Sequence, residues 1–250
     1  MFRRFAAAWR FLTIFPLPFW QGADEGERLA RSPGTFPAVG LVLGIGVTAV
    51  AAFAGRFLPE TATAALMVTL LAYPSGALHL DGLADSADGL LSPGRDREKA
   101  LAVMKDSRIG AHGAVALVLI LLLKYACLAS LALPDLLATL VVVPLAGRAA
   151  MLFPMAMLPY AREKGLGGLF VFGNRATAPL LAMLWTICAM LAFWGVFEAV
   201  VGVTAWLTAT LLWVWFLKAR LGGATGDSYG ATCEIAETVV CLAAAGLLQS

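Results

Sequence analysis

Long apolar runs separated by short polar stretches make up most of this 250-residue chain. A helix needs about 20 apolar residues to cross a bilayer, and most of the runs approach or exceed that length. The pattern therefore predicts about seven membrane-spanning helices, at residues 36–54, 62–80, 111–133, 136–158, 177–200, 203–217 and 235–248. The last two runs are short, so these helices are expected to be tilted, partial or interfacial.

The basic residues lie almost entirely on one side of these predicted spans. Of the 18 Lys and Arg residues, fifteen fall before the first span or in the three long loops 81–110, 159–176 and 218–234. Only Arg56 falls on the opposite side. Because cytoplasmic loops carry the excess of Lys and Arg, the long loops are expected to face the cytoplasm. The predicted fold class is an all-α, polytopic membrane helical bundle with long cytoplasmic loops.

The composition excludes the other broad classes. Apolar residues make up 60% of the chain and charged residues 14%, whereas a soluble domain carries roughly 25% charged residues. No change in composition marks a second domain, so residues 1–250 are expected to form a single integral membrane domain. Residues 1–32 combine Arg with Phe, Trp and Leu, which predicts a segment lying in the membrane interface.

Three carboxylates follow the second predicted span. Asp81, Asp85 and Asp88 are spaced i, i+4, i+7, so on a helix their side chains lie within about 60° of one another. They repel one another unless a cation lies among them, and hard oxygen ligands without Cys indicate Mg²⁺ or Mn²⁺. The structural alternative is a solvated helix end at the interface.

A second polar segment, KDSRIGAHG at residues 105–113, opens the third predicted span from the same side. Ser107, Arg108 and the two glycines would form a cradle for an anion at a helix N-terminus. The alternative is that Asp106 or Ser107 only caps the helix.

A third polar segment, GGATGDSYGATCEIAE at residues 222–237, leads into the last predicted span. Asp227 and Glu234 are spaced i, i+7, and Glu237 lies about 80° from Asp227 if the stretch is helical. Gly223 and the other glycines allow a backbone or a phosphate to approach closely. The alternative is a glycine-rich turn between helices with capping acids.

Cations complete the pattern. Arg148 lies within the fourth span, where a charge costs about 2.5–3.5 kcal/mol and normally faces the bundle interior or a polar cavity. It is expected to pair with an acid or an anionic substrate. The loop at 162–168 adds Arg162 and Lys164. Carboxylates for a metal and cations for phosphates together indicate phosphoryl transfer, and no P-loop motif is present.

With these segments in view, the chain resembles the cobalamin synthase family, the adenosylcobinamide-GDP ribazoletransferases. The resemblance rests on motifs in order along nearly the whole chain: FLTIFPLP, FPAVGLVLG, HLDGLADSADGL, MKDSRIGAHG, the GR pair of the fourth span, ARxKGLGGLF and GGATGDSYGATCEIAE. It implies attack of a ribazole hydroxyl on the cobinamide-linked phosphorus of adenosylcobinamide-GDP, giving adenosylcobalamin or its 5′-phosphate and GMP. It also implies Mg²⁺ as cofactor and a multi-pass protein of a bacterial or archaeal inner membrane.

Carried onto matching positions, the resemblance suggests three groups of residues as hypotheses. The metal ligands would be Asp81, Asp85, Asp88 and Asp227. Substrate would be bound by Arg108, Arg148, Ser107, Lys164, Gly223 and Thr225. The catalytic group would comprise His79, Glu234, Glu237 and Asp106, with a carboxylate near the metal favoured as general base.

Two other functions remain open at this point. A CDP-alcohol-type phosphotransferase shares the use of Asp residues and Mg²⁺, but its usual spacing differs from that of Asp81–Asp88. An ion-coupled transporter would distribute polar residues through the bilayer depth, whereas here they gather at one side. The expected partners are the two substrates and the lipid bilayer, without nucleic acid. Because a corrinoid is large, the pocket is expected to be wide or shared between subunits of a homo-oligomer.

Overall fold

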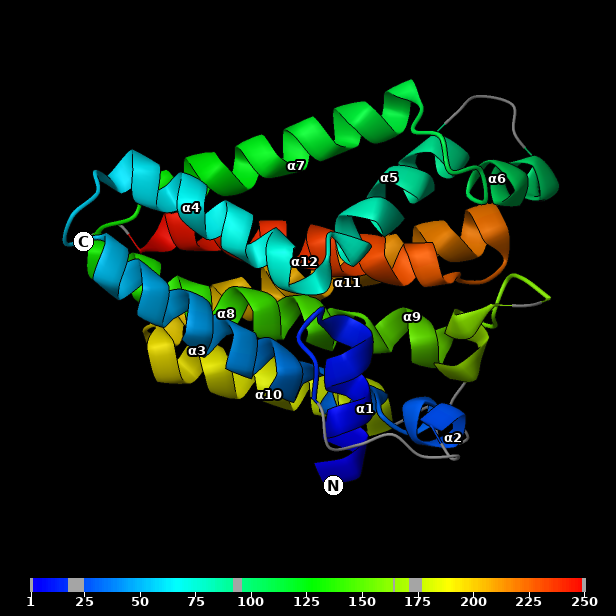
Figure 1. The fold of residues 1–250 in the computed structure, drawn as a ribbon, viewed down its shortest axis with the longest axis horizontal. Helices are drawn as coiled ribbons and strands as arrows, with labels where there is room; N and C mark the ends of the chain where they lie inside the picture. The colour runs from blue at the N-terminus through cyan, green and yellow to red at the C-terminus, as the bar shows by residue number, and fades with distance from the viewer. Residues whose placement is uncertain (1, 18–24, 92–95, 164, 171–176, 249–250) are drawn as a thin grey trace.

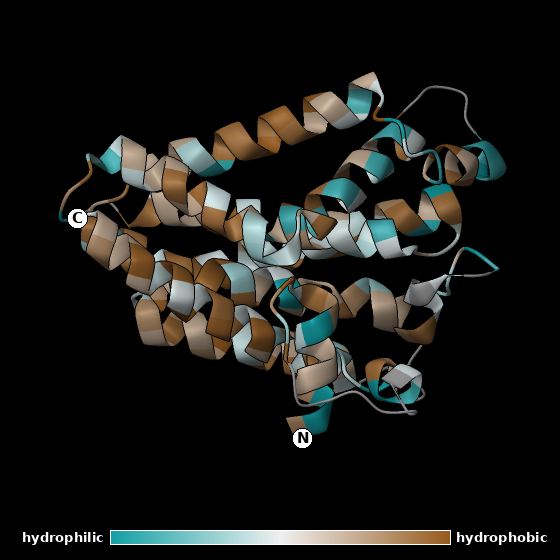
Figure 2. Ribbon diagram, viewed as in Figure 1, coloured by the Kyte–Doolittle hydropathy of each residue, from teal (hydrophilic) through white to brown (hydrophobic). Residues whose placement is uncertain are grey.

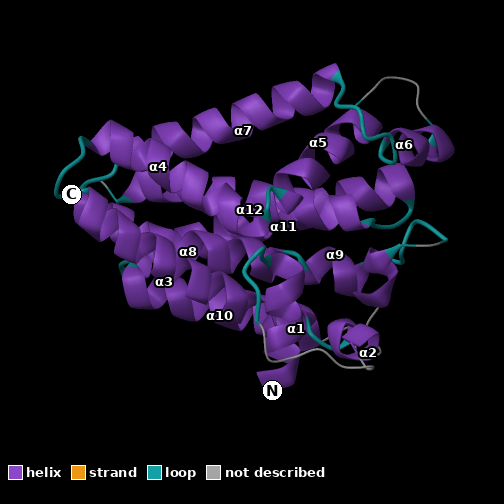
Figure 3. Ribbon diagram, in the orientation of Figure 1, coloured by secondary structure: helices purple, strands orange, loops and turns teal. Residues whose placement is uncertain are grey.

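The structure is a computed structural model and describes residues 2–17, 25–91, 96–163, 165–170 and 177–248. Within these ranges the chain is helical, and its only strand-like feature is one isolated bridge between Tyr160 and Ala224 (Figure 3). The all-α fold class is therefore confirmed. The α-helices are α1 (Phe2–Leu12), α2 (Glu25–Ala30), α3 (Phe36–Ala54), α4 (Glu60–Ala72), α5 (Leu78–Leu90), α6 (Arg97–Val103), α7 (Ala111–Ala129), α8 (Leu133–Ala150), α9 (Leu152–Met157), α10 (Thr177–Phe193), α11 (Val196–Leu221) and α12 (Gly226–Leu247). Short 3₁₀ helices are η1 (Pro33–Thr35), η2 (Tyr73–Ser75) and η3 (Leu166–Phe170).

Fewer helices are long enough to span a membrane than the predicted seven. Among the described residues, five helical stretches have the length and apolarity for a span, and a bent pair of helices makes a sixth if it counts as one span. A further apolar helix, α10, is shorter. The five are Pro33–Ala54, Ala111–Ala129, Leu133–Met157, Val196–Leu221 and Gly226–Leu247. The polytopic helical bundle is confirmed, and the span count is corrected to five or six.

The second predicted span, 62–80, is wrong as a continuous helix. The chain bends by 88° between α4 and α5, as Figure 1 shows where the cyan ribbon of α4 meets the blue-green ribbon of α5. Gly76 and Ala77 have φ angles of 59° and 61°, in the left-handed region, and Pro74 precedes them. Residues in that conformation cannot continue a right-handed helix. The bend turns α5, with its three Asp residues, away from the direction of α4.

The last two spans are longer than predicted. Helix α11 runs from Val196 to Leu221, and α12 begins already at Gly226. Thr225 and Ser228 form a reciprocal capping box that fixes this start. The first half of α12 is polar yet buried inside the bundle, so the apolar pattern alone placed its start too late.

Helix α8 is the centre of the bundle. Every residue from Thr139 to Ala150 is buried, and the helix lies among α3, α10 and α12 (Figure 1). Gly40 and Gly44 of α3 lie directly against the α8 backbone at Pro144 and Val141, where a Cβ atom would clash. Small residues at such points let two helices approach closely within a membrane.

Hydrophilic residues gather at one end of the bundle, where α5, α6 and the start of α12 meet (Figure 2). Helix α1 packs against α3 and buries Ala8 and Leu12 completely. Just beyond it, the amide of Ile14 donates to the carbonyl of Pro74 at 2.8 Å, beside the bend. The N-terminal segment predicted to lie in the interface thus contacts the bundle next to the polar end.

Candidate active site

Two glycine contacts hold the acidic part of α5 against the start of α12. A Cβ atom on Gly82 would lie 2.5 Å from the carbonyl oxygen of Asp227, and one on Gly230 would lie 3.1 Å from the Cα atom of His79. The two backbones therefore approach as closely as atoms allow. This contact brings residues from two distant motifs, 79–90 and 222–237, to one place.

Three of the four predicted metal ligands lie near this contact. Asp81 is exposed, Asp85 is half-buried, and both repel the carboxylate of Asp227. The side chain of Asp227 is 21% exposed, and Arg162 Nη2 donates to its Oδ2 at 2.5 Å. Across the described ranges, no three His, Cys, Asp or Glu side chains are close enough together to coordinate one ion.

Asp88, the fourth predicted ligand, is engaged elsewhere. Its carboxylate accepts hydrogen bonds from the backbone amides of Gly110 at 2.7 Å and Gly113 at 2.9 Å. Gly110 is the N-cap residue of α7 and Gly113 lies in its first turn, so Asp88 caps that helix from α5. The carboxylate predicted to bind a metal therefore has a helix-capping function in this conformation.

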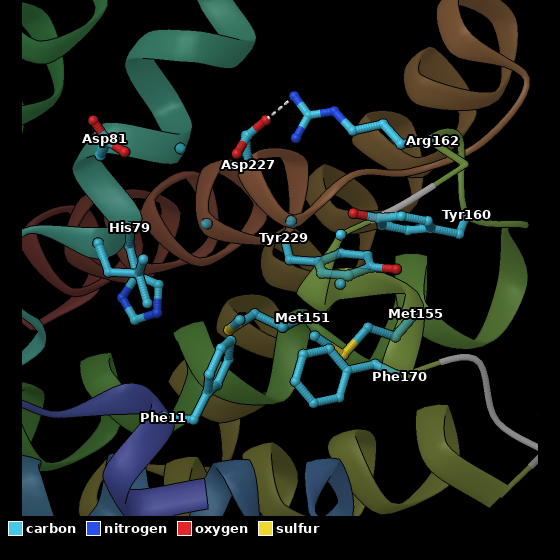
Figure 4. Close-up of a pocket in the computed structure, with 16 residues that line it drawn as sticks. Phe11, His79, Asp81, Met151, Met155, Tyr160, Arg162, Phe170, Asp227 and Tyr229 are labelled. Carbon is cyan, nitrogen blue, oxygen red and sulfur yellow. Dashed lines mark hydrogen bonds and ion pairs between the residues drawn. The ribbon is translucent and has the colours of Figure 1, made fainter. Parts of the chain in front are cut away.

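Two cavities meet beside Asp81. One, of about 240 Å³, lies between the α5–α12 contact and residues 160–170; Figure 4 shows Arg162, Tyr160, Tyr229 and Phe170 around it. The other, of about 660 Å³, contains Asp85 and Ser107. Asp81, Phe11 and Leu78 line both cavities. A group held by Asp81 would therefore be accessible from two sides.

Arg108 and Asp106 lie in a separate hollow of about 460 Å³ at the start of α7, which Asp88 also lines. Arg108 Nη2 contacts Asp106 Oδ2 at 2.6 Å; the Arg108 side chain is largely exposed and that of Asp106 is half-buried. Hydrogen bonds from Arg108 lower the pKa of Asp106 to about 2. In the segment predicted to bind an anion, Arg108 is therefore paired with Asp106. Of Ser107, Arg108, Gly110 and Gly113, only Ser107 lines the larger cavity.

The two predicted catalytic glutamates lie in a buried network of charges. Lys124 Nζ donates to Glu234 at 2.7 Å and to Glu237 at 2.6 Å, and Arg148 donates to the other oxygen of Glu237. Arg148 Nη2 also lies 3.4 Å from Nδ1 of His79. These contacts tie α5, α7, α8 and α12 together.

Only His79 of this network lines one of the cavities described above. The expectation that Arg148 pairs with an acid is confirmed. A catalytic function for Glu234 or Glu237 stays a prediction, and their burial favours a role in packing. Lys124, which the sequence predicts only to reach polar surroundings or a neighbour, has both glutamates as partners, as a Lys within an apolar run requires.

Two further residues predicted to bind substrate, Thr225 and Gly223, shape the backbone of the same region. Thr225 caps α12, and Gly223 lies beneath the carbonyl of Pro159, where a side chain would not fit. Lys164 lies outside the described residues. Two hydrogen bonds, from Ala161 to Ala224 and from Ala224 to Pro159, join these segments at 2.8 and 2.9 Å.

Tyr160 is a site residue that the sequence did not indicate, and Arg162 was predicted only as a cation of the loop at 162–168, without an individual role. Both line the smaller cavity. Arg162 also donates to the carbonyl of Met104 at 3.1 Å. Burial raises the pKa of Tyr160, so its hydroxyl stays protonated at neutral pH. The sequence signal for Arg162 is its position in ARxKGLGGLF, the motif that also contains Lys164.

The model of one family, described as cobalamin-5-phosphate synthase, matches residues 4–245. This chain belongs to the cobalamin-5-phosphate synthase family. Its relatives include the adenosylcobinamide-GDP ribazoletransferases of Geotalea daltonii, with 39% identity over 97% of this chain and 96% of the relative, and of Klebsiella pneumoniae, with 38% identity over 97% and 99%. No solved structure matches the chain.

The motifs that carried the resemblance to cobalamin synthases are far apart in the sequence and meet in space. HLDGLADSADGL forms α5, and GGATGDSYGATCEIAE forms the start of α12 and the loop before it. MKDSRIGAHG leads into α7, and ARxKGLGGLF closes the smaller cavity. The polar end of the bundle is therefore the candidate active site of this cobalamin-5-phosphate synthase family member.

Proposed function

We propose that this chain is an adenosylcobinamide-GDP ribazoletransferase that completes the nucleotide loop of cobalamin. The observation that carries the proposal is the position of Asp81 in the lining of both cavities, with Asp85 beside it in the larger cavity and Asp227, paired with Arg162, in the smaller. Carboxylates and a guanidinium in one partly enclosed place are the groups that phosphoryl transfer requires.

In the proposed reaction, the ribose hydroxyl oxygen of ribazole, or of its 5′-phosphate, forms a bond to the cobinamide-linked phosphorus. The bond from that phosphorus to the bridging oxygen breaks, and GMP leaves with the electron pair. The hydroxyl proton passes to a carboxylate of the acidic group and then to solvent. Such a transfer depends mainly on positioning and charge stabilisation.

Magnesium is part of the proposal. Mg²⁺ commonly binds through one or two carboxylates together with substrate phosphates and water, so it does not require three protein ligands. Asp81 and Asp85, one helical turn apart on α5, fit that requirement, with Asp227 opposite them. When bound, the ion would neutralise charge on the diphosphate.

Arg162 is the proposed phosphate-binding cation. It lines the smaller cavity and is held by Asp227 in this conformation. A diphosphate between the two residues would compete for the guanidinium and leave Asp227 free to act as an oxygen ligand. Arg108 is a second candidate, since its ion pair with Asp106 is exposed and readily exchanged.

The proposed location is the inner membrane, with the active site on the cytoplasmic side. The support is the excess of Lys and Arg in the segments that build the polar end, because cytoplasmic loops carry that excess. Both substrates are nucleotides or nucleosides and would reach this end from the cytoplasm.

The test is turnover by the purified, detergent-solubilised protein. We expect adenosylcobinamide-GDP and α-ribazole phosphate to give GMP and a corrinoid product with Mg²⁺, and neither product with EDTA. GMP release that survives metal removal would overturn the metal assignment alone. If neither product forms while a known ribazoletransferase works in parallel, the proposed function is wrong. Release of CMP from a CDP-alcohol would then support the other phosphotransferase class.

A further inference from the structure

The two cavities that meet at Asp81 differ in size and in lining. The smaller, of about 240 Å³, is walled by the rings of Phe11, Phe170, Tyr160 and Tyr229 and by the thioethers of Met151 and Met155 (Figure 4). Most of these side chains are buried. Flat aromatic and polarizable sulfur groups are the surfaces on which an aromatic ring packs best.

The larger cavity has a different character. It has a volume of about 660 Å³ and continues, through Ile14, Gly76, Leu80 and Leu121, into an apolar groove of about 400 Å³. That groove lies along α4 and α7. The two spaces together form one continuous, open depression that leads from Asp81 and Asp85 toward the apolar surface.

Size separates the two substrates of the proposed reaction. Pockets for drug-sized ligands measure about 300–1,000 Å³, so the smaller cavity is below that range and has no room for a corrin macrocycle. The largest substrate group that this cavity can hold is a single aromatic ring system with its ribose. The open depression is the place that remains for a corrinoid.

We propose that the aromatic cavity is the subsite for the base of the acceptor nucleoside, and that the larger depression receives the corrinoid nucleotide. This inference rests on the proposed function. Asp81 lines both spaces, so the acceptor hydroxyl and the phosphorus meet beside it from different sides. Approach from different sides is what an in-line displacement requires.

Gly226 offers a direct test, because it lines the aromatic cavity and a Cβ atom there would meet no atom within 4 Å. The Cβ atom of Gly226→Leu therefore meets no clash, and we expect the rest of the leucine side chain to occupy part of the cavity. We expect it to raise KM for α-ribazole phosphate by about tenfold or more, while KM for adenosylcobinamide-GDP stays within about twofold. Leu121→Trp, in the larger depression, should do the reverse.

Gly246→Leu is the matched control, since Gly246 lies on the same helix and also has open space around it, but lines none of the cavities described. It should leave both KM values unchanged. If Gly226→Leu raises KM for the corrinoid and not for the nucleoside, the assignment of subsites is overturned. If Gly226→Leu does not fold, the same KM measurement is made on Gly226→Ala, which adds one methyl group.

A binding measurement keeps this inference separate from the proposed function. Equilibrium dialysis of α-ribazole against the detergent-solubilised protein, without corrinoid, should detect binding to the wild type and Gly246→Leu and weaker binding to Gly226→Leu. Equal binding by all three proteins, or by none, would overturn the subsite. If the wild-type protein shows no turnover, the proposed function is refuted, whatever the binding measurement gives.

Discussion

Arg162 Nη2 donates to Asp227 Oδ2 at 2.5 Å and to the carbonyl of Met104 at 3.1 Å. The guanidinium is therefore held between the end of α6 and the start of α12, with its charge directed at a proposed metal ligand. Because the Arg162 side chain is only 13% exposed, solvent screens this pair less than a surface salt bridge. In this conformation a protein cation neutralises Asp227.

Replacing Arg162 should separate metal binding from turnover. In Arg162→Ala, Asp227 loses its counter-ion, so we expect tighter binding of Mn²⁺, measured by electron paramagnetic resonance without substrate. Turnover should fall by about 100-fold, as for loss of a charge-stabilising group. Arg56→Ala, on the opposite side of the bundle, is the control. Weaker Mn²⁺ binding in Arg162→Ala would contradict competition between the arginine and the metal.

Asp85→Asn should abolish turnover and weaken Mn²⁺ binding while the protein stays folded in the membrane. The amide keeps the shape of the side chain and removes the charge that a hard cation requires. Glu60→Gln, which neutralises an acid at the far end of α4, should change neither property. Near-normal turnover by Asp85→Asn would remove this residue from the metal site.

The buried network predicts a stability effect that is distinct from catalysis. Lys124→Met leaves Glu234 and Glu237 without the cation that binds both, and breaking a buried pair costs about 3–5 kcal/mol. The thermal unfolding temperature in detergent should fall markedly. Adding Glu234→Gln to Lys124→Met should recover part of the loss, because one unpaired charge is removed. An unchanged unfolding temperature in the single variant would show that the network does not stabilise the fold.

Gly82→Ala should reduce activity although it adds a single methyl group. The new Cβ atom would meet the Asp227 backbone, so α5 and α12 must separate and the carboxylates move apart. We expect a fall in kcat of at least about tenfold, since small misplacements of reacting groups are costly. Gly246→Ala, where the added methyl group meets nothing, should retain full activity. Equal activity of the two variants would refute the importance of this contact.

The pH dependence of activity should not depend on Asp106. Hydrogen bonds from Arg108 lower the pKa of Asp106 to about 2, so the carboxylate is charged, and the pair intact, at any pH well above that value. The pairing is lost only as pH falls through about 2. Between about pH 5 and 9, Asp106→Asn should therefore have a pH–rate profile of the same shape as the wild type. A missing acidic limb in the variant would assign a titrating role to Asp106.

Much of the fold was predictable because the spans are apolar. The runs that became α3, α7 and the consecutive helices α8 and α9 were recognised nearly at their observed limits. The bend between α4 and α5 was not, because it arises from left-handed backbone at Gly76 and Ala77 within an otherwise apolar run. Helix α12 was placed too short because ion pairs with neighbouring helices, and not apolar side chains, allow its first half to lie within the bundle.

The candidate site was predictable as far as local spacing reaches. The helix that places Asp81, Asp85 and Asp88 on related faces is confirmed. What each carboxylate contacts depends on residues far away in the sequence: Asp88 on the amides of α7, and Asp227 on Arg162. The partners of Glu234 and Glu237 are likewise more than 80 residues away. Spacing within one motif carries no information about such partners.

The hydrogen bond from Ile14 to Pro74 sets an order on the assembly of this protein during its synthesis. Residue 14 leaves the ribosome 60 residues before residue 74, a delay of roughly 3–12 s at about 5–20 residues per second. Until then the N-terminal segment has no bend to dock against. Although it is made first, the segment around Ile14 thus reaches its place only after the bend between α4 and α5 has formed.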